Sequence, residues 1–197
     1  MSYLNQFISA WKFGHTFNSQ VRPTHDQVTT LRAQVTAVLE TEYKQWLHAQ
    51  ATGFAEGIPP RHVINRCHAI SQSFFENYGR HGAATSYPIF VTVGNVFYQG
   101  LDIYGLSKNE LRAIISQGPT TRETLGVHVW LTLSDSTVMD LTLIPTLRAR
   151  GILPAGTREL GSVLMWNEAN PGPFRFRPLL VDNQFLYRVD SIRPPDE

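Results

Sequence analysis

The sequence predicts one α+β domain in which helices pack on an antiparallel β-sheet. Apolar residues recur at spacings of three and four in an N-terminal helical part, about residues 1–82, whereas alternation dominates a β-rich part, about residues 83–197. The chain has 197 residues, 42% of them hydrophobic, which suffices for one core. It contains no internal repeat, low-complexity tract or linker. We therefore treat residues 1–197 as a single domain.

Charge and hydropathy argue against several classes of partner. The 17 Lys and Arg residues nearly balance the 16 Asp and Glu residues, which favours neither a nucleic acid nor an anionic membrane. No segment approaches the roughly 18 consecutive apolar residues of a membrane span. The first residues show no basic leader or sustained apolar run, so we expect a cytoplasmic protein, with export without a cleavable signal left open. The oligomeric state is left open as well.

The first predicted helix begins at a capping box. The Thr24 hydroxyl can accept the N–H of Gln27, whose side chain can return to the N–H of Thr24. Apolar residues then recur on one face: Val28, Leu31, Val35, Val38, Leu39, Trp46 and Leu47. This stripe predicts one helix from Thr24 to about Gln50, ended by the glycines and prolines between 53 and 60.

A second helix is predicted from the spacing of Ile70, Phe74 and Tyr78, with its end at Gly79. Asn65 is our candidate for the N-cap, because its side-chain oxygen can accept N–H groups of the first turn. That choice places Cys67 at the second helical position.

The β-rich part begins with an alternating strand over residues 89–93. Ser107 and Glu110 form a second capping box, which predicts a short helix ending near Gly118. Residues 120–124 read as a polar loop. Further strands are predicted over residues 127–133, 137–143, 162–166, 179–182 and 185–189.

Cys67 is the only cysteine of the chain, so it cannot form an internal disulfide. In the first turn of a helix its thiol lies at the positive end of the helix dipole, which favours the thiolate. Free N–H groups there, including that of Cys67, can stabilise an oxyanion. The alternative interpretation is a small buried thiol on the apolar helix face.

His128 and Asp140 are predicted to meet on one face of a hairpin. With a three-residue turn at 134–136, Trp130 lies opposite Asp140 and His128 opposite Thr142, so the two are diagonal neighbours roughly 7–8 Å apart at the backbone. A two-residue turn would move Asp140 to the other face. A buried carboxylate in this apolar strand needs a donor, and His128 can supply it.

The order of these residues resembles a known superfamily. A helix with Cys67 and His68 in its first turn, a strand with His128 and Trp130, and a strand with Asp140 and Thr142 look like the papain-like fold, in its transglutaminase-like and arylamine N-acetyltransferase branches. The resemblance covers about residues 65–142. It implies a papain-like domain in which Cys67 attacks a carbonyl, His128 transfers the proton and Asp140 orients His128.

The expected activity is therefore that of a cysteine hydrolase working through a thioester. Peptide or isopeptide hydrolysis and protein glutamine deamidation both fit, with a protein or peptide substrate. Acyl transfer of the transglutaminase type is an alternative, as is a non-catalytic interaction domain on the same scaffold. Asn65, His68 and Trp130 are secondary candidates for substrate or oxyanion contacts, although His68 is expected to face solvent and Trp130 to serve mainly in packing.

We expect neither a metal nor a cofactor. The residues that could be grouped as ligands, His62, Cys67, His68 and His81, lack the spacings of zinc motifs. The sequence also contains no phosphate-binding glycine loop, dinucleotide fingerprint or serine nucleophile elbow.

Overall fold

The structure is a computed structural model that describes residues 1–19, 21–80, 87–119, 125–154 and 160–190. The predicted polar loop 120–124 and His81 lie outside the described residues. The elements, in chain order, are α1 (Tyr3–Ser19), α2 (His25–Gln34), α3 (Thr41–Glu56), α4 (Pro60–Val63), α5 (Cys67–Arg80), β1 (Phe90–Tyr98), β2 (Leu101–Asp102), α6 (Lys108–Gln117), β3 (His128–Thr132), β4 (Val138–Asp140), α7 (Leu143–Ala149), β5 (Leu164–Trp166), β6 (Phe174–Val181) and α8 (Phe185–Val189).

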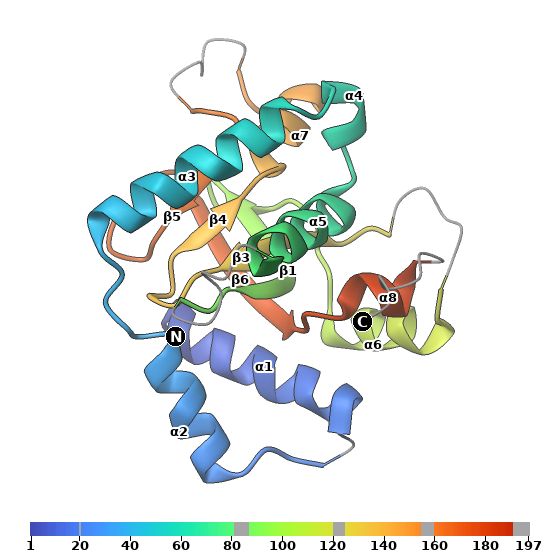
Figure 1. Ribbon diagram of the computed structural model, residues 1–197. Coiled ribbons are helices and arrows are strands. Elements are labelled where there is room, and N and C mark those ends of the chain that lie inside the picture. Colours follow the sequence, from blue (N-terminus) through green and yellow to red (C-terminus); the bar gives the residue numbers. More distant parts are fainter. Residues whose placement is uncertain (20, 81–86, 120–124, 155–159, 191–197) are drawn as a thin grey trace.

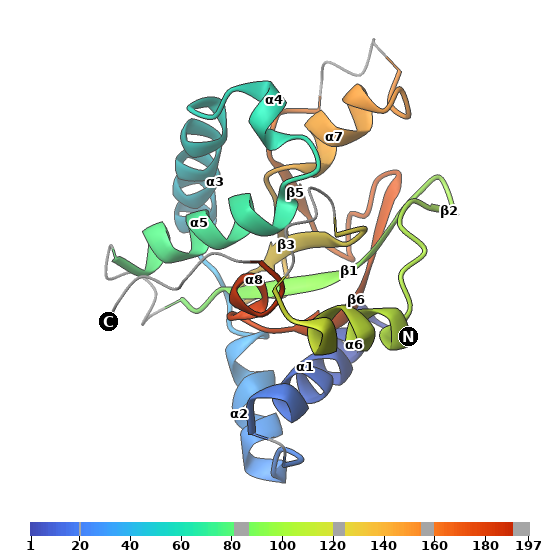
Figure 2. The same ribbon diagram turned by 90° about the vertical axis from the view of Figure 1, so that its right-hand side faces the viewer.

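The described strands form a six-stranded antiparallel sheet with the order β2-β1-β3-β4-β5, and β6 pairs with β1. Helices α3 and α5 lie on one side of the sheet and helices α1 and α2 on the other, as two perpendicular views show (Figure 1, Figure 2). The architecture is thus α+β with helices on an antiparallel sheet, as the sequence predicts. Among the described residues, no helix has the length and apolar character needed to cross a membrane.

Two hydrophobic clusters fill the spaces on the two sides of the sheet. Val129 and Leu131 of β3 belong to the cluster that also contains Phe74 of α5. Trp130 points to the other side and packs with Phe7 of α1. This division confirms the predicted alternation of β3 and shows why the strand is apolar on both faces.

The single helix predicted from Thr24 to about Gln50 is wrong. The capping box is present, with Thr24 N–H donating to Gln27 Oε1 at 2.8 Å, but α2 ends at Gln34 and α3 begins only at Thr41. Val35 is buried in the cluster of α1, and Leu39 in the cluster of α5. Since one straight helix cannot deliver both side chains, the chain turns between them. α3 then continues through Gly53 to Glu56.

Four helices, α1, α4, α7 and α8, were not predicted from the sequence at their positions. α1 has no strong capping signal, and the strand predicted over 185–189 is α8. A turn precedes α8, in which the Asp182 carboxylate accepts the N–H of Gln184 at 2.9 Å. α7 begins at Leu143, three positions after the end of β4 at Asp140, so the strand is shorter than the one predicted over 137–143. By contrast, α6 begins at its predicted Ser107–Glu110 capping box and ends at Gly118.

Candidate active site

The β3–β4 hairpin has the predicted register. Leu131 lies opposite Met139 and Thr132 opposite Val138, and Leu133 N–H donates to Thr137 O at 2.8 Å. The turn has three residues, and Ser136 closes it in the left-handed region with a φ of 64°. This turn length places His128 and Asp140 on the same face.

His128 and Asp140 form a buried pair. Nε2 of His128 lies 2.6 Å from Oδ2 of Asp140, and the side chains are 1% and 0% exposed. The other carboxylate oxygen, Oδ1, accepts the backbone N–H groups of Thr142 at 3.0 Å and Leu143 at 2.9 Å, at the start of α7. These bonds satisfy both oxygens and orient the imidazole.

Nδ1 of His128 is the ring nitrogen left available. It is buried and has no hydrogen-bond partner among the described residues. Because Nε2 carries the proton shared with Asp140, a neutral His128 presents a lone pair at Nδ1. This is the state in which the imidazole can accept a proton.

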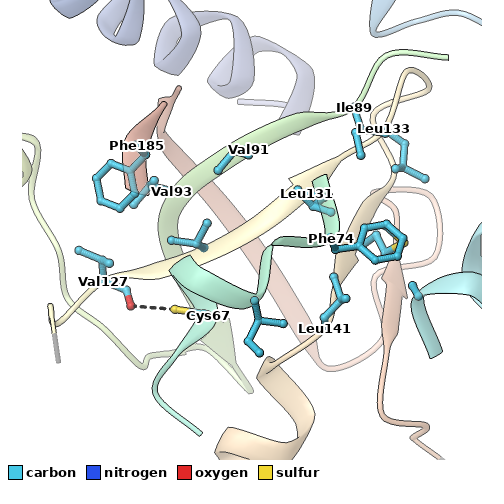
Figure 3. Packing of buried hydrophobic residues seen from close by; sticks show 14 of the residues in the cluster. Cys67, Phe74, Ile89, Val91, Val93, Val127, Leu131, Leu133, Leu141 and Phe185 are labelled. Atoms are coloured by element: carbon cyan, nitrogen blue, oxygen red, sulfur yellow. Dashed lines mark hydrogen bonds between the residues drawn. The ribbon is translucent and has the colours of Figure 1, made fainter. Parts of the chain in front are cut away.

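Cys67 is the first residue of α5 and lies at the start of β3. Its Sγ donates to the carbonyl oxygen of Val127, the neighbour of His128, at 3.4 Å (Figure 3). Ile70 N–H donates to Arg66 O at 3.0 Å, which opens the hydrogen-bond ladder of the helix. The N–H groups of residues 67–69 therefore have no carbonyl acceptor within the helix.

Asn65 is not the N-cap of this helix. Because α5 begins at Cys67, the cap position falls on Arg66. Asn65 adopts a left-handed conformation with a φ of 60°, which asparagine tolerates better than most residues. Its Oδ1 accepts from Nη2 of Arg150 at 2.6 Å and is not used for the helix.

The pKa values of Cys67 and His128 are shifted in opposite directions. Burial raises the pKa of Cys67, but the favourable influence of the neighbouring His128 and His68 outweighs it and lowers the pKa to about 6. Burial lowers the pKa of His128, but the Asp140 carboxylate and the Cys67 thiolate raise it to about 10. Both shifts favour a thiolate at Cys67 and an imidazolium at His128.

His68 does not face solvent, contrary to the sequence-based expectation. It is 8% exposed, and its Nε2 lies 3.7 Å from Oδ2 of Asp190, at the end of α8. Since α8 packs against α5, the second residue of α5 is covered by a segment about 120 residues away in sequence. His68 therefore belongs to the surroundings of the thiol.

A cleft of about 300 Å³ opens on Cys67. Its lining residues are Asn65, Cys67, His68, Tyr104, Leu125, Gly126, Val127, Thr146 and Arg150. Tyr104 covers His128: the two rings are stacked with centroids 4.7 Å apart and an angle of 18° between their planes. The Asp102 carboxylate holds this tyrosine in place by accepting the N–H groups of Tyr104 and Gly105.

Tyr104 and Arg150 were not singled out from the sequence. The Asp102–Gly105 turn is a detectable local signal, but nothing in it indicates that Tyr104 reaches a histidine 24 positions later. Arg150 follows α7, a helix that was not predicted.

Trp130 packs in the protein interior and is not among the residues that line the cleft. It is fully buried, its Nε1 donates to Tyr3 Oη at 2.9 Å, and its ring packs edge-on against Phe176. Its ring also lies 5.9 Å from that of His128, so it supports the imidazole from the protein interior. The side chain therefore packs as expected, and none of its surface is exposed.

Among the described residues, no three His, Cys, Asp or Glu side chains are grouped so that they could hold a metal ion. His62, on α4, is exposed and pairs with its neighbour Arg61, at 3.1 Å between Nε2 and Nε.

Comparison of the chain with models of protein families, with curated proteins and with solved structures finds no match in any of the three. The functional assignment below accordingly stands on the chemistry of the cleft.

Proposed function

We propose that this chain is a cysteine enzyme of the papain-like, transglutaminase-like type that acts on an amide or acyl group. Cys67 is the nucleophile, His128 the acid and base, and Asp140 the residue that orients His128. The observation that carries the proposal is that the two ring nitrogens of His128 have different surroundings. Nε2 is bound to a buried carboxylate, whereas Nδ1 has no hydrogen-bond partner among the described residues. A histidine arranged in this way is suited to proton transfer.

The reaction begins with attack of the Cys67 thiolate on the substrate carbonyl carbon. The tetrahedral intermediate collapses to a thioester as the C–N bond breaks, and the leaving amine takes the proton from Nδ1 of His128. The neutral imidazole then accepts a proton from water as its oxygen attacks the thioester. Release of the acid regenerates the thiolate and the imidazolium.

The first turn of α5 supports the oxyanion in this scheme. The N–H groups of residues 67–69 have no carbonyl acceptor within the helix, and they belong to the same helical turn as the reacting sulfur. Among the lining residues that the structure describes, Asn65 carries the only side-chain amide. We therefore assign the oxyanion contact to backbone N–H groups.

Peptide or isopeptide hydrolysis and glutamine deamidation share these steps and differ only in the amine that leaves. Acyl transfer differs in the acceptor that attacks the thioester. We propose hydrolysis of a protein or peptide amide as the activity, with transfer to an amine as the variant of the same chemistry.

The competing function is a non-catalytic interaction domain. It is favoured by the burial of Cys67, which is 5% exposed and packs within the apolar cluster of α5. A packed thiol of this kind would not require a neighbouring histidine with an unbonded Nδ1.

Acylation by p-nitrophenyl acetate distinguishes the two functions. We expect a burst of p-nitrophenolate equal to one per chain, and an intact mass higher by one acetyl group on Cys67. Cys67→Ser should abolish the burst and His128→Ala should slow it strongly, whereas His62→Ala, a histidine away from the cleft, should leave it unchanged. A folded wild-type protein without a burst would contradict the proposed function.

A further inference from the structure

Of the described residues that line the Cys67 cleft, only Arg150 carries a permanent charge. It directly follows α7, and its N–H donates to Thr146 O at 3.0 Å. Thr146 also lines the cleft, one helical turn earlier. α7 therefore joins the two parts of the site, because its N-terminus binds Asp140 and its C-terminus carries Arg150.

The guanidinium of Arg150 is held in place by two other residues of the cleft. Nη2 donates to Oδ1 of Asn65 at 2.6 Å, and Cζ lies 5.4 Å from the centre of the Tyr104 ring. Since the contact with Asn65 uses a single donor, the remaining N–H groups of the fork are available to a ligand. Stacking on an aromatic ring restricts the side chain without neutralising its charge.

No carboxylate neutralises Arg150 among the described residues. Two other arginines do have such partners: Arg177 lies 3.3 Å from Asp102, and Arg188 lies 2.6 Å from Asp182. The acidic groups nearest the reacting residues are already engaged, Asp140 with His128 and Asp190 with His68. Within the described part of the chain, the cleft thus presents an ordered positive charge that no carboxylate neutralises.

We propose that Arg150 binds a carboxylate of the substrate, so that the acyl group delivered to Cys67 carries a negative charge close to the scissile carbonyl. This inference rests on the proposed function and assigns the substrate class of the same site. A guanidinium suits this task because its planar fork can bind both oxygens of a carboxylate.

The test compares two alkylating reagents of nearly equal size, iodoacetate and iodoacetamide, which differ in charge. In each case the Cys67 thiolate displaces iodide from the CH₂ group. The ratio of the two rate constants reports the attraction for the carboxylate, and a change in thiolate reactivity cancels from it. Because an imidazolium at His128 would also attract anions, the comparison is made between variants.

We expect Arg150→Gln to lower the iodoacetate-to-iodoacetamide ratio by about 5- to 10-fold, which corresponds to one partly exposed ion pair. The glutamine amide can still donate to Asn65. Arg150→Lys, which keeps the charge but not the fork, should give an intermediate ratio. The matched control is Arg148→Gln: Arg148 is outside the cleft lining and donates to Leu160 O at 2.6 Å, so its loss should leave the ratio unchanged.

An unchanged ratio in Arg150→Gln, with rapid alkylation by both reagents, would overturn the anion site and leave the cysteine chemistry standing. An equal fall of the ratio in Arg148→Gln would also overturn it, because general surface charge would then explain the preference. If folded wild-type protein reacted with neither reagent, the proposed function itself would fail.

Discussion

Nε2 of His128 lies 2.6 Å from Oδ2 of Asp140 on a face of the β3–β4 hairpin that solvent does not reach. Burying a carboxylate costs several kcal/mol unless its oxygens are bonded. Oδ1 of Asp140 meets this requirement by accepting N–H groups of Thr142 and Leu143. One oxygen of Asp140 therefore binds the imidazole of His128, whereas the other binds the backbone at the start of α7.

Asp140→Asn separates these two roles. The amide oxygen can still accept the N–H groups of α7, but the amide NH₂ would face His128 and make Nε2 an acceptor. The proton of a neutral imidazole then moves to Nδ1, so the base is in the wrong tautomer. We expect a fall in the acylation rate of roughly 10²- to 10⁴-fold with little change in circular dichroism.

Asp140→Leu is the structural counterpart of that variant. It leaves the N–H groups of Thr142 and Leu143 and the imidazole of His128 without an acceptor, so the free energy of unfolding should fall by about 2–4 kcal/mol. Urea denaturation measures this loss. Full acylation activity in both Asp140 variants would mean that Asp140 serves the fold alone.

The pH profile of alkylation tests the ion pair of Cys67 and His128. Because the pKa of Cys67 is lowered to about 6, the rate constant for iodoacetamide should be half-maximal near pH 6 and level above pH 7. His128→Ala removes the largest favourable influence on the thiolate and should slow alkylation at pH 7 by about tenfold or more. A midpoint in the ordinary thiol range, or labelling only after denaturation, would contradict the pair.

His128 and Cys67 have opposite effects on how the free energy of unfolding changes with pH. Burial lowers the pKa of His128, but Asp140 outweighs this and raises the pKa from 6.5 to about 10. His128 therefore stabilises the fold fully below pH 6.5, and this contribution is lost as pH rises toward about 10. Cys67, whose pKa is lowered from 9.0 to about 6, stabilises the fold above pH 9 and loses this contribution as pH falls toward 6. Between about pH 6.5 and 9 the folded and unfolded states bind equal numbers of protons at this pair, so the two slopes cancel.

Cys67→Ser removes the contribution of Cys67 to this pH dependence and leaves that of His128. His128 beside Asp140 then binds a proton in the folded state that the unfolded chain releases above pH 6.5. Relative to wild type, we expect the free energy of unfolding to fall as pH rises from about 6.5 to 8.5, by up to about 1.4 kcal/mol per pH unit. Urea unfolding of both proteins at several pH values measures this. Parallel pH dependences would show that His128 is neutral in the folded protein.

We expect that a side chain at Gly94 would destabilise the sheet where β1 pairs with β3 next to His128. It pairs with His128 across β1 and β3, beside a β-bulge between β1 and β6. A Cβ there would collide with the carbonyl oxygen of Arg177 and lie 2.8 Å from the Trp130 ring. Gly94→Ala should lower the free energy of unfolding by about 3 kcal/mol.

Gly53→Ala provides the matched control for Gly94→Ala. Gly53 lies inside α3, and no atom lies within 4 Å of an added Cβ. Since alanine favours the helix by roughly 0.5–1 kcal/mol over glycine, this variant should be more stable than wild type. Thermal unfolding of the two variants therefore should shift in opposite directions.

The sequence by itself determined those features whose causes lie close together in the chain. The Ser107–Glu110 capping box and the register of the β3–β4 hairpin depend on contacts between residues less than 15 positions apart. The hairpin register in turn placed His128 and Asp140 on one face. The catalytic roles of Cys67, His128 and Asp140 stay predictions that the experiments above address.

The tertiary structure decided what depends on distant segments. The break between α2 and α3 occurs because Val35 and Leu39 are buried in different clusters, and no local pattern reveals which side of a sheet will cover a residue. Asn65 binds Arg150, 85 positions away, and so leaves the cap position that local propensity favours. Tyr104 and Asp190 likewise reach the site from remote turns. Propensity and periodicity describe a segment, whereas a cleft is formed where several segments pack together, and that packing is settled only by the whole fold.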